Sequence, residues 1–267
     1  MRSTYDWLDT DGGAARVLAV PCGDRRVWLK MPGPPKWRPW HWLQWILVRA
    51  LSLPFLRPTA SRGQRDELRN EAKRMLRFSA LGLPAPQVLS CSRQYLVTAD
   101  AGPTLSSYLA RGDDLHAQRA ALVAAARALG RVHAAGQCHG RPFIKDLAYD
   151  GERVTFLDFE ENPCSVMSLA DAQARDLCLF LMSVVKHTSR KPGSRLLLGR
   201  LLVAYAQVHP PRAIVGALRR NLRALDRLAA PFRRLPRRWL GRDLAAALLI
   251  ESLLLGVLDS PSWLSLF

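Results

Sequence analysis

The stretch HGRPFIKDLAYDGERVTFLDFEE, residues 139–161, decides how the chain folds. It follows an Ala-rich segment, AQRAALVAAARALGRVHAAG (residues 117–136), whose composition predicts a helix that Gly136 ends. Within the stretch, VTFLDF alternates like a β-strand. His139 stands just after the helix and Asp158 stands at the end of the strand, so we expect the chemistry of the protein to be found here.

The chain before this stretch predicts short strands around one helix. ARVLAV (residues 15–20) and RRVWLK (residues 25–30) flank the turn PCGD, and QVLSCS and QYLVTAD predict two further strands. Between the two pairs, residues 64–81 predict a helix that Gly82 and Pro84 end. The pattern of this helix repeats at three and four residues, through Leu68, Ala72, Met75, Leu76 and Ser79.

The chain after this stretch reads as almost wholly helical from Leu169 onward, with breaks at its prolines, Pro192, Pro210, Pro211, Pro231 and Pro236. The fold class expected is therefore α+β. A small strand-rich lobe would span residues 1–100, and a larger helical lobe would span residues 101–267.

Composition limits the partners of the protein. The 267 residues include 39 Lys plus Arg and 22 Asp plus Glu, which gives a formal net charge of +17. Such a charge points to polyanions: nucleic acid, an anionic membrane surface or a phosphate-bearing substrate. Five cysteines are scattered without a Cys-x-x-Cys pair, which argues against a disulfide framework or a structural zinc site and favours a reducing cytosol.

Four polar residues occur in a fixed order along the chain. Lys30 closes the strand VWLK, and Glu71 lies in the helix ELRNEAKRML. His139 begins HGRPFIKD, and Asp158 lies in FLDFEE. With this order, residues 24–181 resemble the protein-kinase-like fold. Within that fold they resemble the small bacterial kinases that phosphorylate lipopolysaccharide core sugars. The resemblance implies an ATP- and Mg²⁺-dependent phosphotransferase.

The resemblance also implies roles for single residues. Lys30 would grip the α- and β-phosphates of the nucleotide, Glu71 would hold that lysine, and Asp158 would bind Mg²⁺. LVTADAGPTLSSYL, residues 96–109, would form the hinge between the lobes, and Asp176 in RDLCLFL would anchor the catalytic loop from beneath. Only the adjacent pair Gly12 and Gly13 could form the loop that covers the phosphates.

The catalytic loop departs from the family pattern H-x-D-x-x-x-x-N. The corresponding positions are His139, Arg141 and Asp146, so an arginine stands where the family has its base. Arginine cannot accept a proton at physiological pH, but it can stabilise charge on a phosphoryl group. We assign Asp146 first as a metal ligand and leave open a second role as relocated base. Two interpretations remain: an active phosphotransferase, or a pseudokinase that serves as a binding module.

Two basic segments bear on localisation. An insertion, residues 31–63, contains Trp37, Trp40, Trp42 and Trp45 with flanking arginines. It fits either an interfacial membrane segment or packing on the core. The second segment, residues 212–242, holds ten arginines and one acid, and it fits an anionic leaflet or a solvated helical face.

Motifs and apolar segments narrow the choice of partner and location. No helix-turn-helix, zinc-finger or RNA-platform pattern occurs, which argues against nucleic acid. The two most apolar segments, residues 40–56 and 244–258, are short and contain charges, so no transmembrane helix is expected. The expected substrate is a lipid-linked sugar, with the protein cytoplasmic and peripheral on the inner face of a bacterial membrane. A protein Ser/Thr kinase is a further possibility.

Overall fold

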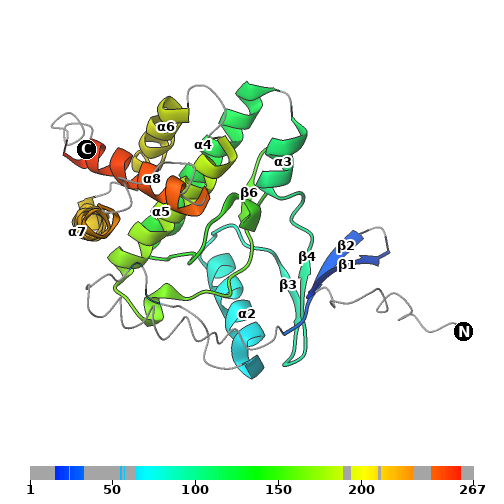
Figure 1. Ribbon diagram of the computed structural model, residues 1–267. Coiled ribbons are helices and arrows are strands. Elements are labelled where there is room, and N and C mark those ends of the chain that lie inside the picture. The colour runs from blue at the N-terminus through cyan, green and yellow to red at the C-terminus, as the bar shows by residue number, and fades with distance from the viewer. Residues whose placement is uncertain are drawn as a thin grey trace, which may run out of the picture.

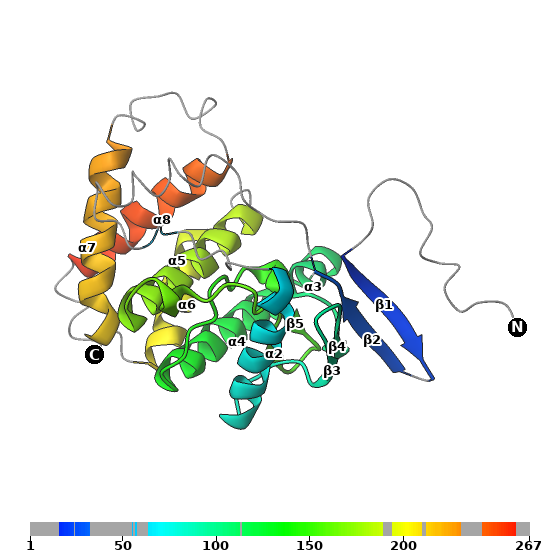
Figure 2. The same cartoon turned by 90° about the horizontal axis from the view of Figure 1, so that it is seen from below.

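A computed structural model gives the structure of the protein. It describes residues 16–23, 25–32, 55, 57, 64–112, 114–188, 194–209, 212–230 and 242–259. Its described residues form an α+β structure with a small antiparallel sheet at one end and a larger helical part beside it (Figures 1 and 2). The expected fold class, at this level of detail, is confirmed.

The sheet contains the four strands expected near the N-terminus, in the order β1-β2-β4-β3. Their bounds are Val17–Cys22 for β1, Arg25–Lys30 for β2, Val88–Cys91 for β3 and Leu96–Ala99 for β4. The β1–β2 hairpin turns at Gly23, whose φ of 59° suits glycine, and it projects away from the helices (Figure 2). In the antiparallel register Lys30 pairs with Leu96. This pairing fixes Lys30 at the end of β2, on a central strand.

Helix α2, Gln64–Ala80, lies beside the sheet and confirms the predicted helix. Its buried apolar face consists of Leu68, Ala72, Met75 and Phe78. The expected face was partly wrong, because Leu76 is 53% exposed and Ser79 is also exposed. The buried stripe runs through the Phe78 side of the helix, because the aromatic ring buries more apolar surface there than Leu76 would.

The helical part begins with α3, Leu105–Arg111, which follows strand β4. It continues with α4 Leu115–Ala134, α5 Leu169–Thr188, α6 Ser194–Ala206, α7 Arg212–Ala229 and α8 Arg242–Leu258. The proline breaks expected after α5 and before α7 and α8 fall between these helices. The segment expected as a hinge, residues 96–109, holds strand β4 and then α3, which Thr104 caps by accepting a hydrogen bond from Ser107 N at 3.2 Å.

A second, two-stranded sheet lies between α4 and α5 in the chain. Strand β5, Leu147–Tyr149, pairs antiparallel with β6, Val154–Phe156, and the short 3₁₀ helices η2, Ile144–Asp146, and η3, Pro163–Ser165, flank this pair. The sequence predicted β6 but not β5. All three residues of β5 are buried, so the strand lacks the alternation that would have marked it.

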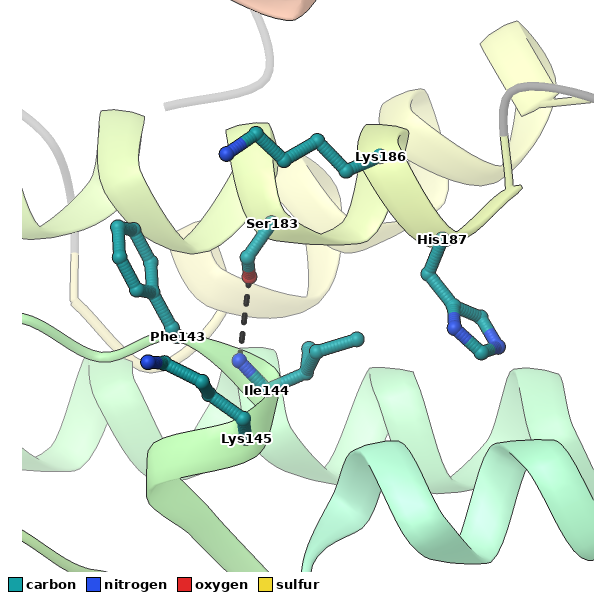
Figure 3. A pocket seen from close by; sticks show the side chains of 6 residues that line it. All are labelled: Phe143, Ile144, Lys145, Ser183, Lys186 and His187. Atoms are coloured by element: carbon teal, nitrogen blue, oxygen red, sulfur yellow. Dashed lines mark hydrogen bonds between the residues drawn. The ribbon is translucent and has the colours of Figure 1, made fainter. Parts of the chain in front are cut away.

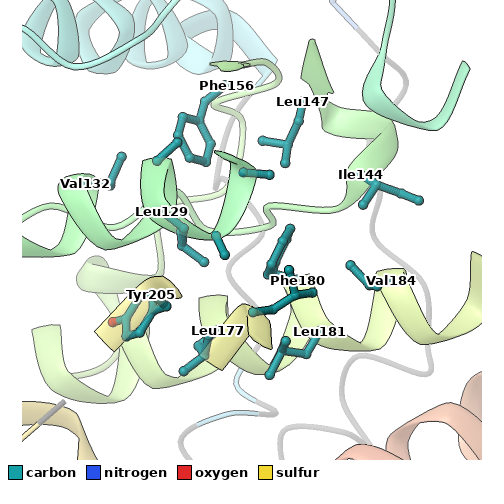
Figure 4. Packing of buried hydrophobic residues seen from close by; sticks show 14 of the residues in the cluster. Leu129, Val132, Ile144, Leu147, Phe156, Leu177, Phe180, Leu181, Val184 and Tyr205 are labelled. Atoms are coloured by element: carbon teal, nitrogen blue, oxygen red, sulfur yellow. The ribbon is translucent and has the colours of Figure 1, made fainter. Parts of the chain in front are cut away.

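The core of the helical part forms where α4, α5 and α6 meet (Figure 4). Leu129, Leu177, Phe180 and Tyr205 fill it and are almost fully buried. The Tyr205 hydroxyl lies 2.7 Å from His133 Nδ1, which satisfies both polar groups within the apolar surroundings. This packing buries α5 in the core. Asp176 of α5 in turn binds the backbone of residues 139 and 140, where the candidate site begins.

Part of the sequence lies outside the described residues. This includes Gly12 and Gly13, most of the insertion with its four tryptophans, and residues 231–241 of the Arg-rich segment. Phe55, near the end of the insertion, is buried, and Arg57 donates a hydrogen bond to the Val166 carbonyl at 2.6 Å. In the part of the chain that the structure describes, no helix is both long and apolar enough to cross a membrane.

Candidate functional site

An ion cluster joins three residues from distant parts of the chain. Lys30 Nζ lies 2.7 Å from Glu71 Oε1 and 2.8 Å from Asp158 Oδ1. Lys30 comes from β2, Glu71 from the buried face of α2, and Asp158 from the segment just after β6. Glu71 precedes Ala72 on the inward face of α2, so the packing that buries this helix also directs its carboxylate at the lysine.

The electrostatics of the cluster keep Lys30 and Asp158 charged. Burial opposes the charge of Lys30, but Glu71 and Asp158 outweigh burial and raise the pKa of the lysine. Burial likewise opposes the charge of Asp158, yet Lys30 and Arg141 lower its pKa to about 2. At Glu71, burial is the larger effect and raises the pKa. The site therefore holds an ammonium and an ionised Asp158 at neutral pH.

The backbone at Asp158 has an unusual conformation. Its φ of 55° makes it the one non-glycine residue with positive φ in the described part of the chain. Aspartate tolerates this region better than bulkier residues. The next amide, Phe159 N, donates to Glu71 Oε1 at 3.2 Å. This turn directs the Asp158 carboxylate toward Lys30 while Phe159 stays in the core.

Arg141 lies at the centre of the acidic groups. Its Nη2 donates to Asp158 Oδ2 at 2.5 Å, its Nε lies 3.4 Å from Asp146 Oδ2, and its Nη1 lies 3.5 Å from Glu161 Oε1. The attraction of these carboxylates outweighs burial and raises the pKa of Arg141. The guanidinium thus occupies the space between Asp146 and Asp158, the two candidate metal ligands.

Asp146 closes η2 and is 9% exposed. Burial raises the pKa of Asp146, and Arg141 offsets part of the rise. Its Oδ2 atom is buried and forms no hydrogen bond of ordinary geometry. A buried oxygen of this kind beside the carboxylate of Asp158 is a suitable donor for Mg²⁺. No group of three His, Cys, Asp or Glu side chains within the described ranges forms a ready metal cage, so Mg²⁺ would need further oxygens from a ligand.

The Asp176 carboxylate fixes the backbone of residues 139 and 140. Asp176, on α5, accepts hydrogen bonds from His139 N at 2.6 Å and Gly140 N at 2.9 Å. His139 Nε2 donates to the Leu157 carbonyl at 2.7 Å, and its ring packs on Phe156 and Phe159. Burial lowers the pKa of His139 to about 4, so the ring is neutral at pH 7. A fully buried ring cannot touch a substrate, and His139 therefore positions the loop.

Sequence reasoning missed Arg74. Its guanidinium donates to four backbone carbonyls, those of Cys138, His139, Phe159 and Glu161. It ties the segment before Arg141 to the segment after Asp158. The spacing in the sequence could have indicated this residue, because Arg74 follows Glu71 by three residues and therefore lies on the same face of α2.

Two further contacts support the same segments. Glu161 accepts from Arg175 Nη2 at 2.9 Å. Cys138 Sγ lies 2.9 Å from Cys164 Sγ, which the scattered positions of these free thiols did not suggest. The first contact joins helix α5 to the segment after Asp158, and the second joins the residue before His139 to that same segment.

The structure thus brings together Lys30, Glu71, Arg141, Asp146 and Asp158, with His139 directly beneath them. Gly12 and Gly13, expected to cover a phosphate, lie outside the described residues.

Comparison with known proteins adds little to this geometry. No protein-family model matches the chain. It is 30% identical over 146 residues to an uncharacterized protein of Haemophilus influenzae. The match covers 54% of this chain and 53% of that protein, so the chain spans about half the length of the relative it matches.

Proposed function

We propose that the protein is an ATP-dependent phosphotransferase with a two-lobed, protein-kinase-like fold. The observation that carries the proposal is the meeting of Lys30 with Glu71, 41 residues away, and with Asp158, 128 residues away. A half-buried lysine that Glu71 holds in place, on a strand facing a helix, is suited to holding a polyanion. Phosphoryl transfer relies on such positioning and charge neutralisation.

Each residue of the site would have its own role in phosphoryl transfer. Lys30, held by Glu71, binds nucleotide phosphate oxygens as a fixed point charge. Asp158 and Asp146 would hold Mg²⁺, which supplies charge neutralisation at the phosphates. Arg141 carries its charge beside Asp158 and can stabilise the transferring phosphoryl group once it releases that carboxylate. Burial raises the pKa of Asp146, which makes its carboxylate a better proton acceptor if it serves as the relocated base.

A pseudokinase is the second candidate, and one contact favours it. Arg141 Nη2 donates to Asp158 Oδ2 at 2.5 Å, where a metal ligand should be open. If Arg141 keeps this position, the arginine replaces the metal, and the protein is a binding or regulatory module without phosphoryl transfer.

The acceptor and location follow from the chemistry of the whole chain. The net charge of +17 and the Trp-rich insertion support a peripheral position on the inner face of a membrane, beside anionic lipid. A lipid-linked sugar of the lipopolysaccharide type is the acceptor that suits this position. A protein Ser/Thr kinase is the alternative within the same enzyme class. Nucleic acid is not proposed as a partner.

Thermal unfolding with nucleotide tests the central claim. ATP with Mg²⁺ at about 100 times its Kd should stabilise the wild type by about 2.7 kcal/mol. Asp158→Asn should remove the Mg²⁺-dependent part, and Lys30→Met should weaken ATP binding even without Mg²⁺. Lys73→Met, which removes an exposed lysine on α2, is the matched control and should bind like the wild type. Absence of any ATP-dependent stabilisation in the wild type would reject nucleotide binding.

Labelled ATP separates the enzyme from the pseudokinase. An active enzyme transfers the γ-phosphoryl group to a lipid-linked sugar in membrane extracts, and Asp158→Asn does not. Binding of ATP without transfer to lipid, sugar or protein would support the pseudokinase.

A further inference from the structure

A pocket of about 370 Å³ opens outside the ion cluster, which contributes none of its lining residues (Figure 3). It lies between the loop that leads into η2 and the second half of α5, and it is lined by Phe143, Ile144, Lys145, Ser183, Lys186 and His187. Its volume falls in the lower part of the range for small-molecule sites. The size suits a single sugar ring with its substituent.

One hydrogen bond fixes the walls of the pocket relative to each other. Ser183 Oγ accepts from Ile144 N at 3.2 Å and donates to the Phe180 carbonyl at 2.7 Å. The loop is therefore joined to α5 at the floor of the pocket (Figure 3). Because α5 is buried in the helical core, this wall is preformed rather than shaped by a ligand.

The pocket carries positive charge and no carboxylate. Lys145 comes from η2 and Lys186 from α5, and none of the six lining residues is Asp or Glu. Figure 3 shows both lysine side chains extending toward the Phe143 end, with His187 at the other end. Two ammonium groups at one end of a pocket favour an anion with several oxygens.

Phe143 connects this pocket to the candidate active site. Its ring centroid lies 5.9 Å from Lys186 Nζ and 5.9 Å from Arg141 Cζ. Arg141 is the residue that contacts Asp158, and Lys145 directly precedes Asp146 in the chain. A molecule in the pocket would therefore lie next to the groups that would transfer a phosphoryl group.

We propose that this pocket is the acceptor subsite and that it binds a phosphorylated sugar, with Lys145 and Lys186 on the phosphate and Phe143 against the sugar ring. The inference rests on the proposed function and narrows its substrate class: the acceptor already bears a phosphate before the transfer. It disfavours a neutral sugar or an unmodified serine, neither of which would use the two lysines.

Direct titration tests the subsite without requiring phosphoryl transfer. The probe is a hexose 1-phosphate, titrated calorimetrically into the full chain, with glucose and inorganic phosphate as comparison ligands. Lys145→Met and Lys186→Met should each weaken binding of the hexose 1-phosphate about tenfold, the loss of one charge-assisted contact of about 1.4 kcal/mol. Lys186→Arg should bind the hexose 1-phosphate within about twofold of the wild type, because it keeps a charged donor for phosphate. Lys73→Met is the control for a general change in charge.

The outcomes separate this inference from the proposed function. Unchanged affinity in both lysine variants, or no binding by the wild type, overturns the subsite. Loss of hexose phosphate binding on saturation with ADP and Mg²⁺ also overturns it, because the anion would then occupy the nucleotide site. Retention of the ATP-dependent thermal shift in both variants is expected, so a failed subsite leaves the nucleotide test intact. Equal affinity for inorganic phosphate would overturn the sugar specificity.

Discussion

Arg74 shows how much one side chain can fix around the ion cluster. Its planar guanidinium reaches carbonyls in both segments that carry the site, before Arg141 and after Asp158. Within the described part of the chain no backbone N–H donates to these carbonyls, so the arginine supplies the hydrogen bonds that regular structure would have given. Its hydrogen bonds go to backbone carbonyls and its guanidinium lies over the Phe159 ring, so Arg74 is a positioning residue.

Replacing Arg74 with lysine should destabilise the protein by about 3 kcal/mol, because an ammonium cannot reach four carbonyls in a fixed fork and leaves buried acceptors unsatisfied. Urea denaturation measures the change. Arg77→Lys, at an exposed position one turn further along α2, is the matched control and should change stability by less than about 0.5 kcal/mol. Equal midpoints for the two variants would show that the carbonyl contacts do not carry this stability.

At the scale of elements, the loop that begins at His139 depends on a close approach to the segment after Asp158. Gly140 has a φ of 109°, and a Cβ built on it would overlap the Glu161 carbonyl. Gly151, in the turn between β5 and β6, has the same φ of 109° but no heavy atom within 4 Å of a built Cβ. The two glycines therefore share the backbone strain and differ in the clash.

Gly140→Ala and Gly151→Ala should separate these effects. Both substitutions place alanine at positive φ, which costs about 1–3 kcal/mol. Gly140→Ala should cost a further ~1–3 kcal/mol, because the loop must move away from Glu161. It should also weaken ATP binding by displacing Arg141 and Asp146. The difference between the two unfolding free energies is the measurement, and equal losses would mean that Gly140 is needed only for its φ.

At the scale of the whole molecule, the buried histidine beneath the site links stability to pH. The pKa of His139 falls from 6.5 to about 4 because burial opposes its charge. The unfolded chain takes up a proton near pH 6.5, whereas the folded protein does so only near pH 4. Stability from this group is therefore present above pH 6.5 and is lost as the pH falls toward 4.

Between about pH 7 and pH 5 this group should cost the wild type about 2 kcal/mol of unfolding free energy. His139→Gln keeps a donor for the Leu157 carbonyl and should lack that part of the pH dependence. His116→Gln, at an exposed position, should keep the wild-type slope. Burial raises the pKa of Glu71, which acts with the opposite sign, so the comparison of variants isolates His139. Equal slopes for His139→Gln and the wild type would contradict the assignment.

Local chemistry made the elements of this fold predictable. A repeat at three and four residues predicted α2, short runs flanking a turn predicted β1, β2, β3 and β4, and alternation predicted β6. Glycines such as Gly82 and Gly136 marked helix ends because only they adopt positive φ without strain. Strand β5 could not be found, because a fully buried strand of three residues shows no alternation. The order of Lys30, Glu71 and Asp158 along the chain likewise marked the candidate site.

Tertiary structure alone decided which groups meet. Glu71, Arg74 and Phe78 share one face of α2. Only the packing of this face shows that Glu71 pairs with Lys30, that Arg74 binds four backbone carbonyls and that Phe78 is buried in the core. The contact of Arg141 with Asp158 depends on two loops that converge over Asp176.

The pocket between Lys145 and Lys186 likewise joins two distant parts of the chain through α5. Sequence by itself determined the elements, because helix and strand periods depend on neighbours in the chain. Only the tertiary structure decided the charge pairs and the pocket, because electrostatic and packing energies are set by distances between residues that the fold brings together.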